Sequence, residues 1–165
     1  MIIPDGVTTI GSWAFYYCRN LKRLSIGSGV QTIEYYAFYQ CYGFTDVEIK
    51  GNITTINNFT LSGCGNLVNV VLGSGFNSIP DNFFSGCSKL KTVVIKGNIT
   101  SIDNNAFNNC NQLSEIYYSG NASSWAGISK GSNNTKLDSA TIYYYSETPI
   151  ENGWHYVDGV ATKYE

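Results

Sequence analysis

Hydrophobic and polar residues recur along this chain with a period of 23 positions. The cysteines show the period without a single insertion or deletion: Cys18, Cys41, Cys64, Cys87 and Cys110. Aliphatic residues keep the same interval on both sides of the cysteine, so that Ile10 and Leu24 recur as aliphatic residues in every later unit. A fixed period of this length indicates a repeat architecture. The chain is therefore predicted to contain five copies of one structural unit.

Within each unit the spacing of apolar residues changes from one type of local structure to another. Residues 21–26 alternate as a half-buried strand does, residues 27–29 read as a glycine turn, and residues 30–33 form a second extended piece. Residues 37–41 have the 3–4 spacing of a short helical turn. One unit has a single apolar side, so neighbouring units must stack to bury it. We therefore expect a repeat solenoid, a β-rich α/β fold with a parallel sheet on one face and short helical turns on the other.

The register of the repeat divides the chain into three parts. Five 23-residue units, with a truncated unit at the N-terminus, are predicted for residues 1–121. Residues 122–146 are predicted to form a C-terminal cap, because the terminal unit of a solenoid must cover the last layer of the core. Residues 147–165 are predicted to form a tail or a small hairpin around Asp158-Gly159. Ile3-Pro4 falls at the end of a strand in this register, which implies a preceding repeat.

The run IPDGVTTIGSWAFYYCRNLKRLSIG, residues 3–27, and its four echoes resemble the BspA-type leucine-rich repeat. That family's pattern joins an Ile-Gly-x-x-Ala-Phe-x-x-Cys turn to a Leu-x-x-Leu-x-Ile strand. The Ala-Phe pair returns at Ala37-Phe38 and Ala106-Phe107, whereas Thr60-Leu61 and Phe83-Phe84 replace it conservatively. The resemblance implies a leucine-rich-repeat fold for residues 1 to about 121.

The end of the chain carries a second resemblance. The run YYSETPIENGWHYVDGVAT, residues 144–162, is similar to the tail of BspA-like surface proteins of gut Gram-positive bacteria. Together the two resemblances imply an extracellular or cell-surface location and adhesion to host extracellular-matrix proteins or other surface proteins. Residues 1–6 lack the charged and apolar regions of a signal peptide.

Charge and hydropathy argue against several classes of partner. Ten basic residues stand against twelve acidic ones, the formal net charge is −2, and neither sign forms a run. Binding of nucleic acid would require a basic face, which this composition does not supply. No apolar stretch approaches the about 20 residues that span a bilayer. We therefore expect no nucleic-acid partner, no membrane span in this chain, and a monomer.

The chain has no combination of residues that predicts catalysis. It has one histidine, His155, no Cys-x-x-Cys pair, and neither a phosphate-binding loop nor a Gly-x-Ser-x-Gly motif. The cysteines share one repeat position between apolar neighbours, and stacked side chains that run parallel do not form disulfides readily. We expect five buried free thiols, no metal or other cofactor, and no enzymatic activity.

Two columns of outward-facing strand positions form the first candidate binding surface. One column is polar and consists of Arg23, Asp46, Asn69, Thr92 and Glu115. The other column contains Glu48, Val71, Val94 and Tyr117. Apolar side chains on a solvent-facing sheet, ringed by polar ones, are typical of protein contact sites. We predict that Val71, Val94 and Tyr117 are exposed and form the centre of a contact surface.

Aromatic residues on the turns of the first two units form the second candidate surface: Trp13, Tyr16, Tyr36 and Tyr39. Tyrosine and tryptophan are favoured in contact sites because they bury much area at little entropic cost. Later units place serine and asparagine at such positions, for example Ser62 and Asn105. Two other interpretations remain open, namely packing against an upstream domain and stacking of the rings between units.

These observations favour a binding protein. The preferred hypothesis is an extracellular protein-recognition module that binds a host matrix protein or another surface protein through one face of the solenoid. The alternative is a structural spacer or stalk that holds another domain away from the cell wall and has no ligand of its own. An apolar patch on the strand face would favour binding, and a uniformly polar face would favour the spacer.

Overall fold

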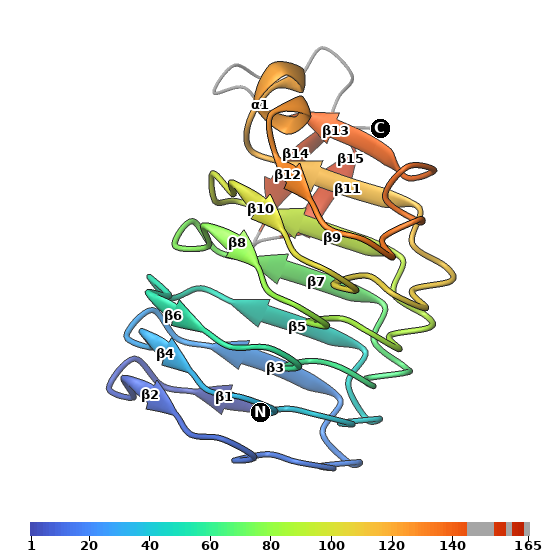
Figure 1. Ribbon diagram of the computed structural model, residues 1–165. Helices are drawn as coiled ribbons and strands as arrows, with labels where there is room; N and C mark the ends of the chain where they lie inside the picture. The colour runs from blue at the N-terminus through green and yellow to red at the C-terminus, as the bar shows by residue number, and fades with distance from the viewer. Residues whose placement is uncertain (145–153, 158–159, 164–165) are drawn as a thin grey trace.

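The computed structural model describes residues 1–144, 154–157 and 160–163. The chain winds into successive coils that stack along one axis (Figure 1). Each coil contributes one strand to a long sheet, then a short second strand, then a run of turns. The predicted repeat solenoid is confirmed, and its parallel sheet covers one side of the stack.

The long sheet has seven parallel strands in the order β1-β3-β5-β7-β9-β11-β13. Their bounds are β1 Ile2–Ile3, β3 Arg23–Ile26, β5 Asp46–Ile49, β7 Asn69–Leu72, β9 Thr92–Ile95, β11 Glu115–Tyr118 and β13 Thr141–Tyr144. The register between β3 and β11 advances by one repeat per strand, so Leu24 lies beside Val47 and Val47 beside Val70. These three side chains are buried, as the alternation of the sequence predicts.

Short second strands form two further parallel sheets. One contains β2 (Thr9–Ile10), β4 (Thr32–Ile33) and β6 (Thr55–Ile56), and the other contains β8 (Ser78–Ile79), β10 (Ser101–Ile102) and β12 (Ser129–Lys130). The isoleucines of β2, β4, β8 and β10 are buried, so these strands close the core on the side next to the long sheet.

The third side of each coil is a run of tight turns, and helical structure on it is minimal. Backbone amides alternate between two kinds of acceptor: Phe15 N donates to Ala37 O in the next coil at 2.8 Å, whereas Tyr16 N donates to Trp13 O at 3.1 Å. Tyr17 N again donates to the next coil, at Tyr39 O. A helix would direct every amide to its own turn. Here every second amide donates instead to a carbonyl of the next coil.

The alternation requires left-handed backbone at two positions of each coil. The first column with positive φ consists of Trp13, Tyr36, Phe59, Asn82 and Asn105. The second column consists of Tyr17, Gln40, Gly63, Gly86 and Asn109. Glycine and asparagine adopt this conformation readily, whereas bulky aromatic residues rarely do. The turn side therefore restricts which residues fit without backbone strain. The first coils nevertheless carry aromatic residues at these positions, where glycine or asparagine is favoured.

The cysteines form a column of free thiols inside the stack. Cys64 Sγ lies 3.3 Å from Phe38 O, and the thiols of Cys41, Cys87 and Cys110 donate to carbonyls in the same way. Burial raises the pKa of the Cys41 and Cys110 thiols to about 12 and also raises that of Cys87, because a thiolate would lose its hydration there. Cys18, in the first coil, is only half-buried, which corrects the expectation of five buried thiols.

The last coil departs from the repeat. Asn121 caps the short helix α1 (Ala122–Ala126), and its side chain accepts from Ser124 N at 2.9 Å. Trp125 of α1 is buried, together with Ile128 and Leu137, and these side chains cover the last layer of the core. Farther along the chain, β14 (Trp154–Val157) and β15 (Val160–Lys163) pair antiparallel. The residues between them, Asp158-Gly159, lie outside the described part of the chain.

Thiol accessibility provides the first prediction. Titration of the native protein at neutral pH with a disulfide reagent should modify Cys18 first, because it is half-buried, and the other four thiols slowly. In denaturant without reductant the count should reach five. Immediate reaction of several thiols in the native protein would show that the column is open to solvent.

A pair of glycines tests the left-handed backbone. Gly86 has φ +78°, and a Cβ built there would meet only ordinary contacts at 3.6 Å or more, so Gly86→Ala adds conformational strain without a clash. The substitution should lower the free energy of unfolding by about 1–2 kcal/mol. Gly65→Ala, where φ is not positive and a Cβ also has room, should be neutral or slightly stabilising. Urea denaturation measures both, and equal effects would contradict the assigned backbone.

Candidate binding surfaces

The outer face of the seven-stranded sheet, here called the strand face, carries the first candidate residues. Strand register brings the polar column into one row that runs from Arg23 through Asp46, Asn69 and Thr92 to Glu115. The second row runs from Ser25 through Glu48, Val71 and Val94 to Tyr117. Both rows lie as the 23-residue period predicts.

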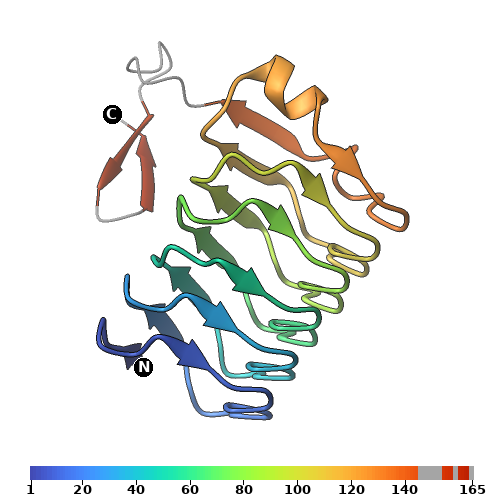
Figure 2. The ribbon, with the colours of Figure 1, turned by 60° about the vertical axis from the view of Figure 1, so that its left-hand side comes forward.

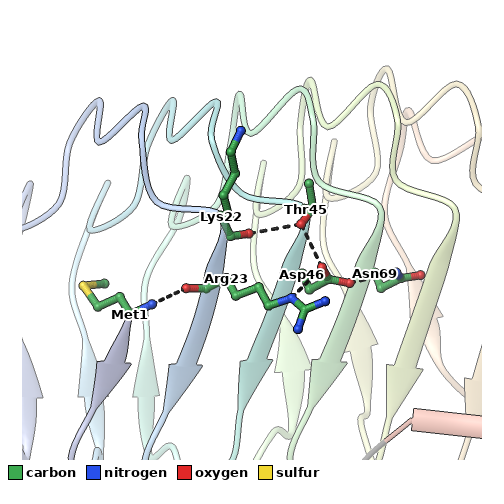
Figure 3. A network of polar contacts seen from close by, with 6 residues as sticks. All are labelled: Met1, Lys22, Arg23, Thr45, Asp46 and Asn69. Atoms are coloured by element: carbon green, nitrogen blue, oxygen red, sulfur yellow. Dashed lines mark hydrogen bonds and ion pairs between the residues drawn. The ribbon is translucent and has the colours of Figure 1, made fainter.

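Asp46 is the centre of the polar network in Figure 3. Its Oδ2 lies 3.5 Å from Arg23 Nε and accepts from Thr45 Oγ1 at 2.7 Å, while its Oδ1 accepts from Asn69 Nδ2 at 2.9 Å. The Arg23 side chain is 83% exposed, so the ion pair is well hydrated and contributes little to stability. Three side chains thus hold the carboxylate in place, and they give this row a fixed pattern of charge.

The predicted exposure of Val94 and Tyr117 is wrong. Val94 is 4% exposed and Tyr117 is 2% exposed, although both face outward and neither belongs to the main core. Tyr117 stacks on Tyr143 of β13 with ring centroids 4.7 Å apart. Figures 1 and 2 also place the β14–β15 hairpin on the outer side of the sheet, beside its C-terminal strands. Val94 and Tyr117 are therefore buried at this end of the strand face, where Tyr143 lies on Tyr117, and Val71 is half-buried at the margin.

The rest of the strand face is open and hollowed. One hollow of about 420 Å³ lies over Ile2, Ser25, Glu48 and Val71, with Arg23, Asp46 and Asn69 along one side. A second hollow of about 530 Å³ shares Glu48 and Val71 and continues past Lys50 to Lys96. The small side chain of Ser25 between Ile2 and Glu48 makes the first hollow possible. We call the two together the strand-face groove.

Part of this groove was predicted from the sequence. It identified Arg23, Asp46, Glu48, Asn69 and Val71 as outward-facing, but it did not single out Ile2, which is 78% exposed. An alignment of the repeats could have identified Ile2. Ile2 occupies the same column as Ser25, and an aliphatic residue at an outward position is unusual.

The second candidate surface, here called the aromatic face, lies on the turns of the first two coils. Trp13, Tyr16, Tyr17, Tyr35 and Tyr42 are each between 37% and 49% exposed. Tyr36 and Tyr39 are half-buried between them. The structure thus brings the predicted residues together, with Tyr17, Tyr35 and Tyr42 of the same aromatic-rich turns beside them.

Rings on the aromatic face stack between coils. Trp13 lies on Tyr36 with centroids 4.2 Å apart and planes 7° apart, and Tyr36 lies on Phe59 at 4.9 Å. The open interpretation of stacking between units is therefore correct. Stacking leaves the outer parts of the rings exposed, however, so it does not remove the surface as a candidate. All three residues of this ladder have left-handed backbone, which the sequence pattern did not reveal.

Within the described part of the chain, no group of three or more His, Cys, Asp or Glu side chains could hold a metal ion. The same residues include no helix that is long and apolar enough to cross a membrane.

Solved bacterial structures share this architecture. A leucine-rich repeat protein from Eubacterium ventriosum is 33% identical over 70% of this chain and 31% of its own, with a TM-score of 0.66. A leucine-rich cell surface protein from Faecalibacterium prausnitzii is 30% identical over 99% of this chain and 42% of its own, with a TM-score of 0.63. A leucine-rich repeat protein from Bacteroides ovatus, 23% identical with a TM-score of 0.57, shares the fold. The chain thus spans less than half the length of each.

No curated protein matches the chain. The family model for the BspA-type leucine-rich repeat region matches residues 1–124 with six copies. The match includes the coils that build both candidate surfaces and most of the core that supports them. The chain belongs to the BspA-type leucine-rich repeat family.

Proposed function

We propose that this chain is a protein-recognition module of the cell surface, which binds a polypeptide partner through the strand-face groove. The single observation that carries the proposal is the burial of Val94 and Tyr117 outside the main core. Tyr143 of β13 stacks on Tyr117 at this end of the row. The groove continues the same row through Val71 and Ser25 without such a cover.

The chemistry of the groove fits a polypeptide. Ile2 offers an apolar contact at one end of the groove and Val71 another where the two hollows meet, and the paired charges of Arg23 with Asp46 and of Lys50 with Glu48 lie beside them. Apolar contacts within a polar rim are the usual anatomy of a protein interface. The contacts of Asp46 with Arg23, Thr45 and Asn69 give the rim a fixed pattern of charge, which supports a role in binding.

The family supports a surface location, and one structural relative is described as a cell surface protein. Adhesion to a host matrix protein or to another surface protein is the finer form of the proposal. The alternative function is that of a structural spacer or stalk without a ligand, and such a protein would have no need of a binding groove.

Val71→Lys tests the groove. Val71 is half-buried and lies at the margin, so its lysine can reach solvent and the protein should remain folded. Binding to a panel of purified extracellular-matrix and surface proteins should weaken by more than tenfold, which corresponds to about 1.4 kcal/mol. Ser25→Arg, which fills the hollow between Ile2 and Glu48, should have the same effect. Surface plasmon resonance measures both.

The control is the pair Tyr16→Ser and Tyr39→Ser on the aromatic face, which should leave binding to those proteins unchanged. Loss of binding in the tyrosine pair together with normal binding in Val71→Lys would mean that the partner uses the other face. Absence of any bound protein across the panel would favour the spacer.

Val94→Lys separates the covered end of the strand face from the open part. Because Val94 is 4% exposed, its lysine would be an uncompensated buried charge. The free energy of unfolding should fall by about 3 kcal/mol or more, whereas Val71→Lys should change it little. Equal urea midpoints for the two variants would show that the end of the face is open after all.

A further inference from the structure

The aromatic face contains two sets of rings at right angles. Trp13 and Tyr36 are parallel within 7° and stack face to face at 4.2 Å. Tyr16 and Tyr39 are parallel within 12°, but their centroids are 6.0 Å apart and their planes stand at 87° and 83° to that of Trp13. One coil-to-coil step separates the members of both pairs. Tyr16 and Tyr39 are therefore nearly parallel neighbours one coil apart, at right angles to the stack of Trp13 on Tyr36, and the pair is here called the strip.

The fold itself does not require these aromatic rings. Two coils after Tyr16 and Tyr39 the same positions hold Ser62 and Ser85, and those coils keep the same turns. Trp13 has φ +61°, where the fourth coil uses asparagine, a residue that adopts this conformation far more readily. The rings therefore point to a role beyond folding.

The charged side chains nearest to the aromatic face already make contacts within the chain. The guanidinium of Arg19 lies 3.8 Å above the ring centre of Tyr17. Glu34 Oε2 accepts from both the backbone amide and the hydroxyl of Ser12, each at 2.9 Å. Within the described part of the chain, no protein group hydrogen-bonds the phenolic hydroxyls of Tyr16 and Tyr39. The surface thus offers ring faces and hydroxyls, and it offers little charge to an incoming ligand.

We propose that the aromatic face is a binding site for a neutral glycan chain. A sugar ring presents a flat face of C–H groups, which packs on an aromatic ring, and a rim of hydroxyls, which bond to phenolic oxygens. The strip formed by Tyr16 and Tyr39 extends over two coils, so it matches a ligand of repeated flat units. The site lies on a different side of the coil from the strand-face groove, and this proposal does not rest on the proposed function.

The packing of the rings favours a glycan over a protein partner. Protein hot spots are side chains that enter desolvated pockets. Here Trp13, Tyr36 and Phe59 follow one another at 4.2 and 4.9 Å and leave no gap for a side chain between them. A flat ligand that lies along the strip needs no such gap.

Affinity electrophoresis of the full chain through gels that contain a soluble neutral polysaccharide tests the proposal. The panel is a β-glucan, a xylan and a mannan, and isothermal titration with the matching oligosaccharide follows any retardation. At least one neutral glycan should retard the native protein. Tyr16→Ser with Tyr39→Ser should weaken that binding by at least tenfold and leave the urea midpoint nearly unchanged, because later coils already carry serine there.

Val71→Lys on the strand face is the matched control and should bind the glycan as the native protein does. Failure of every neutral glycan in the panel, or equal retardation of the tyrosine pair, overturns the proposal. Binding only to a charged polysaccharide, abolished by salt, also overturns it, since the site would then act through Arg19. A protein that binds through Tyr16 and Tyr39 while no glycan binds would assign the face to a protein partner instead.

Discussion

Coil-to-coil hydrogen bonding is the constraint on which the rest of this molecule depends. A single coil buries only one side of its apolar residues, so its stability comes from the neighbour that covers it. The 23-residue interval keeps each strand in register with the next, as Val47 is with Val70. On the turn side the same stacking takes alternate amides, such as those of Phe15 and Tyr17, away from their own turn. Any insertion inside a coil would break both ladders at once.

The strand side and the turn side of the coil accommodate this stacking with different backbone conformations. Strand positions are extended, which most residues tolerate, so their outward side chains can vary from Arg23 to Val71 without backbone strain. Turn positions with positive φ favour glycine and asparagine, and the later coils conform at Asn82 and Gly86. The first coils instead place Trp13 and Tyr36 there, and ring stacking offsets part of the conformational cost. Residues that the left-handed conformation does not favour, such as Trp13 and Tyr36, are therefore easiest to recognise on the turn side.

Periodicity in the sequence was sufficient to predict the stack, the strand register and the two outward columns. The turn conformation was not predictable from it, because the 3–4 spacing of Ala37, Phe38 and Cys41 suits a helical turn and a left-handed turn equally. The covering of Val94 and Tyr117 was not predictable for a different reason. It depends on residues after the last repeat, which have no counterpart in the period. The structure therefore places the candidate groove nearer to Ile2 and Ser25 than the sequence predicted, whereas the aromatic face lies where the sequence predicted it.

Amide hydrogen exchange of the native protein tests the coil-to-coil ladder most directly. The account predicts that the amides of Phe38 and Leu61, which donate across coils to Thr60 and Phe83 on the turn side, exchange as slowly as those of the central strands. The amide of Asn20, in the first coil, provides a reference outside the ladder. Fast exchange at Phe38 and Leu61, at rates like those of an unprotected turn, would contradict the account, because the turn side would then be held by local bonds alone.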